Sequence, residues 1–442
     1  MNGAYFKKIN YNIRVLFRIF TVVFFLFAAM GLAVGIIISR ASVATAGGSE
    51  NNHVIAPAAL KTVEPPAKEI RQDIKVSLSE KIEKSGRYVV KTVNGDEAVL
   101  TLDLRLQKRA EDFLKSNRVA FGAVVAVEPA TGRVLAYAEH SEYDPSHNIF
   151  SISKPYLAAS LFKIITAEAV LTEKKIPIDE TLCYHGGTHK LTDKLLKENP
   201  RTDRRCQTFE QALGHSTNVI FARLAHKNLT PFQLNEHARS FLFGEPIPFE
   251  VAVENSVAVI PQDLEEMAKT AAGFGEVKIT PLHASMIAAA VANEGVMMRP
   301  FIVESLVKAD GTNVPSPGGS AIATVTSAGV ADLLSQMMYT TTTEGTGRKA
   351  FRVKRGKLDF KNDIPIAGKT GSLSDKGVYR REYTWYSGFG PVDAPEIAVA
   401  ALVVNHISWR TKGSYVAREI FEEYFKNKRT LAAAATSRKK IR

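Results

Sequence analysis

The chain has 442 residues, 45% of them hydrophobic and 23% charged, with a formal net charge of +12. This length allows one large domain or two ordinary ones, and the composition is typical of a globular protein. The positive charge suits nucleic acid, anionic lipid or an acidic polymer. The basic residues are spread along the chain and no nucleic-acid motif is present, which excludes nucleic acid as the expected partner.

The first predicted element is a membrane-spanning helix at 19–39, IFTVVFFLFAAMGLAVGIIIS, which contains no charged residue and is long enough to cross a bilayer once. Four basic residues lie within 1–18, whereas only Arg40 follows closely. The positive-inside rule therefore predicts a cytoplasmic tail at 1–18 and places the rest of the chain outside. A signal peptide cleaved near Ala44-Thr45-Ala46 is the alternative, but the apolar run exceeds the usual signal core.

After the predicted span, residues 40–86 are assigned to a stalk, because 41–75 is rich in Ala, Ser, Pro and small polar residues. The next run, 87–102, holds two β-rich segments around Asn94-Gly95, which predicts a hairpin. An amphipathic helix is expected at 103–116 and a second hairpin at 121–139, turning at 128–132.

The remaining pattern is helical from about 157 to 293 and strand-like near the end. Strands are expected to begin near Ile364, Glu382 and Glu396, followed by an amphipathic helix at 414–428 and a basic, solvated tail at 429–442. Strands at both ends and helices between them favour one sheet built from both ends of the domain. We therefore expect an α/β (α+β) fold, with an antiparallel sheet flanked by helices and an inserted all-helical subdomain.

Chemistry is first indicated by the run 158–166, AASLFKIIT, in which Ser160 and Lys163 stand alone among mostly apolar residues. Positions i and i+3 share a helix face. Burial lowers the pKa of a lysine, and a neutral amine beside a hydroxyl can accept its proton and activate the serine for acyl transfer. If Ser160 begins the helix, the positive helix end also favours a developing oxyanion.

Ser-x-x-Lys is a weak motif, since it also occurs at Ser151, Ser305 and Ser437. Pro155 disfavours a helix beside the first of these, the second lies in a strand-like run, and the third lies in the basic tail. Only Ser160 opens a long apolar helix. A capping serine with a snorkelling lysine is the structural alternative there.

Two further triplets strengthen the catalytic interpretation. Ser216-Thr217-Asn218 precedes an apolar helix. The Ser216 hydroxyl, the second after that of Ser160, can relay a proton, and Asn218 can bind a substrate amide, although a helix cap is the simpler interpretation. Lys369-Thr370-Gly371 begins a strand-like run, where Lys369 and Thr370 can bind a carboxylate and Gly371 permits close backbone approach. A strand with an exposed basic residue is the alternative.

Cys183 and Cys206 are the only two cysteines. A disulfide is permitted if the domain lies outside the cytoplasm, and two buried free thiols are the other possibility. Without histidine partners the pair does not favour zinc, and no other metal site or cofactor is expected.

In this order, the three triplets resemble the motif set of penicillin-binding proteins and serine β-lactamases. The gaps of about 55 and about 150 residues suit that family, as do collinear flanking segments over roughly 97–427. The resemblance implies a penicillin-binding transpeptidase domain, which we place at 87–428. It implies an enzyme that acts on D-Ala-D-Ala ends of peptidoglycan stem peptides and is acylated by β-lactams.

The resemblance also implies the role of each site residue. Ser160 would attack the penultimate carbonyl with Lys163 as general base, and Ser216 with Lys369 would help protonate the leaving amine. Asn218 would hold the peptide backbone, and Thr370 with Lys369 the terminal carboxylate. The backbone N–H groups of Ser160 and Ser372 would form the oxyanion hole.

The sequence departs from the family at Leu157-Ala158-Ala159, where a Pro-Gly usually precedes the nucleophile. We expect no glycosyltransferase domain or large pedestal, and hence a transpeptidase domain on a stalk anchored in the bacterial cytoplasmic membrane. Wall-synthesis partners such as a glycosyltransferase are expected to place it. A D,D-carboxypeptidase or β-lactamase of the same fold, and a non-catalytic penicillin-binding sensor or scaffold, are the alternatives.

Overall fold

The computed structural model describes residues 74–144, 149–187, 190–353, 358–360, 363–374, 381–406 and 410–440. The chain divides into units at 1–67 and 68–442, and the described residues belong to the second. The predicted membrane span at 19–39 therefore lies outside them. Within the described ranges, no helix combines the length and apolar character needed to cross a membrane.

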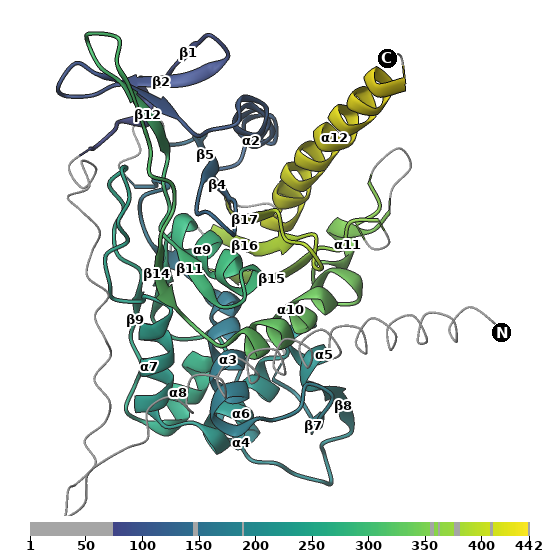
Figure 1. The fold of residues 1–442 in the computed structure, drawn as a ribbon. Helices are drawn as coiled ribbons and strands as arrows, with labels where there is room; N and C mark the ends of the chain where they lie inside the picture. The colour runs from purple at the N-terminus through teal and green to yellow at the C-terminus, as the bar shows by residue number, and fades with distance from the viewer. Residues whose placement is uncertain are drawn as a thin grey trace, which may run out of the picture. The chain divides into compact units, whose positions relative to one another are not determined.

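A five-stranded antiparallel sheet forms the centre of the domain (Figure 1). Its strands are, in spatial order, β15 (Ala367–Ser374), β16 (Arg381–Gly390), β17 (Ile397–His406), β4 (Phe121–Val127) and β5 (Val134–Ser141). The β4–β5 hairpin and the three late strands meet where β17 pairs with β4, Val404 opposite Phe121. The prediction that both ends of the domain build one sheet is thus confirmed.

Both faces of this sheet are buried, which explains the nearly continuous apolar run of β17. Its residues alternate between two cores: Ala400 and Leu402 belong to one, and Ala401 and Val403 to the other. Helix α9 (Pro281–Ala292) packs on the first face, while α12 (Gly413–Lys440) and α2 (Leu104–Ser116) cover the second (Figure 1).

Helices between β5 and β15 form most of the insertion. Besides α9, they are η2 (Ala159–Phe162), α3 (Lys163–Lys174), α4 (Asp193–Leu196), α5 (Phe209–Gly214), α6 (Asn218–Asn228), α7 (Pro231–Ser240), α8 (Leu264–Ala271), α10 (Ala328–Thr343) and α11 (Arg348–Phe351). Helix α3 is buried on nearly every side through Leu171, as its apolar sequence predicts. It packs against α6, α7 and α10, and so holds its first turn inside the domain.

The insertion is not all-helical, which corrects the prediction. It contains the hairpin of β7 (Thr181–Tyr184) and β8 (Arg205–Thr208), and β9 (Val257–Ala258) and β10 (Val277–Ile279), which form a sheet with β6 (Tyr156–Leu157). A further pair joins β11 (Val296–Met298) to β14 (Ala321–Thr324). These strands have two to four residues, too few for an alternating pattern to reveal them.

The N-terminal hairpin is confirmed and is part of a larger sheet. Strands β2 (Arg87–Lys91) and β3 (Glu97–Leu100) pair around Gly95, whose φ is +82°, and the order is β1-β2-β3-β12-β13. The partners are β1 (Ile82–Lys84), β12 (Val303–Val307) and β13 (Asn313–Pro315). Because η1 (Leu78–Glu80) and β1 are ordered elements, the predicted stalk cannot extend to residue 86.

The C-terminal helix is longer than predicted. The sequence placed its end at 428 and a solvated tail at 429–442, whereas α12 continues to Lys440 (Figure 1). The run Leu431–Ala435 is rich in alanine, the best helix former, so the backbone continues beyond the amphipathic part.

Candidate active site

Ser160 and Lys163 lie at the junction of η2 and α3. The sequence predicted that Ser160 opens the helix. In the structure the α-helix begins at Lys163, and Ser160 belongs to the preceding 3-10 turn. In a 3-10 turn the side chains at i and i+3 are eclipsed. This local geometry brings Lys163 Nζ to 2.8 Å from Ser160 Oγ.

The surroundings of Lys163 match a neutral amine. Its side chain is fully buried, and Nζ lies 2.7 Å from Asn218 Oδ1 and 2.6 Å from the Ala272 carbonyl oxygen. Both atoms only accept hydrogen bonds, and Nζ also donates to Ser160 Oγ. When the amine is neutral, its two N–H bonds serve Asn218 and Ala272, and its lone pair faces the Ser160 hydroxyl. Burial lowers the pKa of Lys163 well below its ordinary value, and the positive charge of Lys369 lowers it further.

Ser216 lies in a strained turn between α5 and α6, with φ +59° in the left-handed region. Its Oγ accepts a hydrogen bond of 2.9 Å from Lys369 Nζ, which also donates to the Thr370 carbonyl at 2.8 Å. Lys369 is fully buried in β15, and burial lowers its pKa to about 7. The Ser216–Asn218 triplet thus contacts Lys369 through Ser216 and Lys163 through Asn218.

Strand β15 carries the third triplet at the edge of the main sheet. Thr370 is half-buried and Ser372 exposed. A Cβ on Gly371 would stand 3.2 Å from the Ala158 carbonyl oxygen, so this glycine keeps β15 close to η2. An edge strand retains backbone polar groups that its own sheet does not pair.

Three contacting residues were not found from the sequence. The Ala272 carbonyl binds Lys163, and the adjacent Gly273 has φ +93° and packs so closely that a Cβ would lie 2.6 Å from the Ala159 carbonyl oxygen. Thr346, in the turn after α10, places Oγ1 2.5 Å from Thr370 Oγ1, and its N–H donates to the Gly214 carbonyl. The Gly-Thr-Gly of residues 345–347 was the available signal, since it marks a tight turn.

The two cysteines lie apart from this cluster, on the β7–β8 hairpin. Cys183 and Cys206 are directly opposed in the strand register and form a disulfide with an S–S distance of 2.08 Å. Both residues are exposed, so neither is the buried thiol that the sequence left open.

The assembled groups have the chemistry of a serine acyltransferase. A hydroxyl lies beside a buried amine whose pKa is well below its ordinary value, and a second hydroxyl bonds to an amine whose pKa is about 7. The first pair can generate and discharge a nucleophilic oxygen, and the second can shuttle a proton near neutral pH. None of the hydrogen-bond acceptors described for the two amines is a carboxylate.

Comparison with known proteins gives a consistent result. Residues 122–426 match the model of the penicillin binding protein transpeptidase domain. The peptidoglycan D,D-transpeptidase PbpA of Mycobacterium tuberculosis is 30% identical over 348 residues, which cover 70% of this chain and 68% of that protein. The stage V sporulation protein D of Bacillus subtilis is 25% identical, over 71% of this chain and 50% of its own.

Solved structures show the same fold. The imipenem acyl-enzyme complex of penicillin-binding protein A from M. tuberculosis aligns with a TM-score of 0.62 at 26% identity, over 75% of this chain and 80% of that one. The D,D-transpeptidase domain of a peptidoglycan glycosyltransferase from Eggerthella lenta aligns with a TM-score of 0.61 at 24% identity, covering 76% and 84%.

Proposed function

The chain belongs to the penicillin-binding protein transpeptidase family, and we propose that it is a serine D,D-transpeptidase that cross-links peptidoglycan stem peptides. The observation that carries this proposal is the contact between Ser160 Oγ and the buried amine of Lys163, at 2.8 Å. A substrate ending in D-Ala-D-Ala is the acyl donor, and an amine of a neighbouring stem is the acceptor. β-Lactams acylate the same serine.

In the acylation step, Ser160 Oγ attacks the carbonyl carbon of the penultimate D-Ala and its proton passes to Lys163 Nζ. The new oxygen–carbon bond gives a tetrahedral intermediate, whose oxyanion is stabilised by the backbone N–H groups of Ser160 and Ser372. Collapse breaks the peptide C–N bond. The departing amine takes its proton through Ser216 and Lys369, which are joined by a hydrogen bond.

Recognition of the donor is assigned to Asn218 and β15. The side-chain amide of Asn218 holds the peptide backbone while its Oδ1 accepts from Lys163. Thr370, beside the Lys369 ammonium, binds the terminal carboxylate. After D-Ala has left, the acceptor amine attacks the acyl carbon and gives its proton to the Ser216–Lys369 pair, which restores the proton spent in acylation. The bond between the acyl carbon and Ser160 Oγ then breaks, and the proton held by Lys163 returns to Ser160.

The setting of the enzyme follows from the sequence. The uncharged run at 19–39 anchors the chain in the bacterial cytoplasmic membrane, with 1–18 inside and the catalytic domain outside. Wall-synthesis proteins, among them a glycosyltransferase, place the domain at its substrate.

Mass spectrometry of the full-length protein after treatment with labelled penicillin tests the function. β-Lactam opening adds the entire inhibitor to one residue, and we expect the adduct on the peptide containing Ser160 and its loss in Ser160→Ala. Ser151→Ala is the matched control, because Ser151 begins another Ser-x-x-Lys and should not affect labelling. An adduct on Ser151 or Ser216, or none, contradicts the proposal.

A second measurement separates transfer from hydrolysis. The wild-type protein, not treated with penicillin, is given a D-Ala-D-Ala stem peptide with and without an amine acceptor. Dimer formation supports a transpeptidase, whereas release of D-Ala with water as the sole acceptor identifies a carboxypeptidase.

A further inference from the structure

The middle residue of the Ser216–Asn218 turn makes an unexpected contact. Thr217 occupies the N-cap of α6, where a threonine hydroxyl ordinarily accepts a bond from the first turn. It makes no such bond here. Its Oγ1 instead donates to Gln207 Oε1 at 2.7 Å, across ten residues of chain. The helix-cap interpretation of this triplet is therefore wrong for the Thr217 side chain.

The turn needs external support because its backbone is strained. A non-glycine residue with positive φ, such as Ser216 at +59°, persists only where neighbouring structure holds it. On one side the α5 backbone does so: Ser216 N–H donates to the Leu213 carbonyl and Thr217 N–H to the Ala212 carbonyl. The Gln207 side chain holds the turn from β8.

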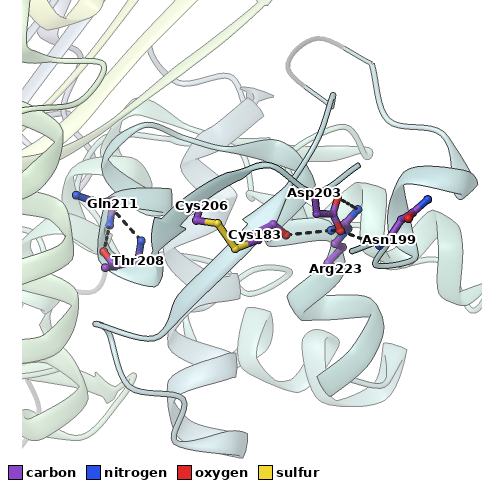
Figure 2. Close-up of a disulfide and its surroundings, with 7 residues drawn as sticks. All are labelled: Cys183, Asn199, Asp203, Cys206, Thr208, Gln211 and Arg223. Carbon is purple, nitrogen blue, oxygen red and sulfur yellow. Dashed lines mark hydrogen bonds and ion pairs between the residues drawn. A yellow bond between two sulfur atoms is a disulfide. The ribbon is translucent and has the colours of Figure 1, made fainter. Parts of the chain in front are cut away.

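Gln207 is itself held by both of its neighbours in the chain. Cys206 is bonded to Cys183 of β7, and Thr208 forms a capping box with Gln211 at the start of α5 (Figure 2). Gln207 is therefore flanked in the chain by a disulfide at Cys206 and by a helix capping box at Thr208.

Helix α6 reinforces the same hairpin. Arg223 donates through both terminal nitrogens to Asp203, at 2.9 and 3.2 Å, and to the Cys183 carbonyl at 3.1 Å (Figure 2). The helix that begins with Asn218 thus also binds the strand that carries one half of the disulfide. The hairpin therefore contacts this part of the chain twice: β8 binds the Ser216–Asn218 turn through Gln207, and β7 binds α6 through Arg223.

We propose that Gln207 is a positioning residue for the Ser216–Asn218 turn, and that the Cys183–Cys206 disulfide, by holding Gln207, makes acylation of Ser160 sensitive to reduction. The inference rests on the proposed acylation chemistry. Both cysteines are exposed, so a small dithiol can reach them. The dithiol supplies two electrons and two protons, becomes a cyclic disulfide, and leaves two cysteine thiols.

The first experiment measures the rate of acylation by fluorescent penicillin in the full-length protein. Gln207→Leu and Thr217→Val each remove one partner of the bond and are expected to lower the rate about tenfold to 100-fold, the scale of a small misplacement. Gln207→Glu keeps an acceptor oxygen and Thr217→Ser keeps the hydroxyl, so both should restore the rate. The double variant should lose no more than either single one.

Gln233→Leu is the matched control. Gln233 Oε1 accepts from the Thr230 hydroxyl at 3.1 Å in the capping box of α7, so the same type of bond is removed elsewhere. Its acylation rate should equal that of the wild type. A rate for Gln207→Leu equal to that of the control, or additive losses in the double variant, overturns the positioning role.

The second experiment repeats the measurement after treatment with a dithiol. We expect reduction, or the paired change Cys183→Ser and Cys206→Ser, to slow the wild type severalfold but to have no further effect on Gln207→Leu. An equal loss in both overturns the link through Gln207. Failure of the wild type to be acylated would instead refute the proposed function, whereas normal acylation with indifferent Gln207 variants refutes this inference alone.

Discussion

Two regions of the molecule bury basic side chains in opposite ways. Behind the main sheet, Arg418 is 1% exposed and its guanidinium donates to Glu422 at 3.1 Å and to the Ala350 carbonyl at 2.9 Å. In the candidate active site, Lys163 and Lys369 are equally buried, yet hydroxyls, an amide oxygen and backbone carbonyls receive their hydrogen bonds.

This difference distinguishes a structural arginine from lysines whose protonation can change. A guanidinium stays protonated in a protein, so its burial requires an anion beside it. An ammonium deprived of both water and an anion loses its proton more easily, and the pKa of both lysines of the site is lowered. A cation buried with a carboxylate keeps its charge, whereas an amine buried without one is suited to the role of base proposed for Lys163.

The strongest test replaces a lysine of the site with an arginine. Lys163→Arg introduces a permanent positive charge and offers no lone pair for the Ser160 proton, because arginine is not deprotonated in proteins. We expect acylation by penicillin to fall at least about 10³-fold, within the range of general base catalysis. A rate above one tenth of the wild type would show that Lys163 is not the base.

The converse test acts on the structural region. Arg418→Met removes the buried cation beside Glu422 and leaves it the partly exposed Lys426, at 3.1 Å. This should cost about 3 kcal/mol in the free energy of unfolding. Urea denaturation measures this loss, with Arg105→Met, an exposed arginine on α2, as a control that shifts by less than about 0.5 kcal/mol. Acylation by the folded protein should be unchanged in both variants. If Arg418→Met were as stable as the wild type but were not acylated, the assignment of Arg418 to a purely structural role would be wrong.

The sequence identifies the residues of the proposed catalytic cluster more readily than those that position them. That Ser160 meets Lys163 and Ser216 meets Lys369 could be predicted because these side chains are polar in apolar surroundings and fall in three spaced triplets. The strands and α2 could be predicted from turn residues and hydrophobic periodicity.

The positioning contacts could not be predicted in this way. The Ala272 carbonyl is a backbone atom, so residue identity carries no sign of its bond to Lys163. Thr346 and Gly214 lie 132 residues apart and meet only once α10 has packed on α5. In the β7–β8 hairpin only Leu182 and Tyr184 of β7 alternate with exposed residues, which is too short a pattern to predict a strand, and the two cysteines mark its register.

A smaller effect, in the pH dependence, follows from Lys369. Its pKa of about 7 means that the protonated form, needed to bind carboxylate and supply a proton, is lost as the pH rises through that value. Lys163 must instead be neutral, and the charge on Lys369 helps to keep it so. The acylation rate should therefore fall about tenfold per pH unit above about pH 7, with an acid limb set by Lys163. Lys369→Arg gives the site a cation that does not titrate in this pH range. Its pH–rate profile should lose the basic limb whatever its absolute rate, and a limb that remains near pH 7 in this variant would assign the titration to another group.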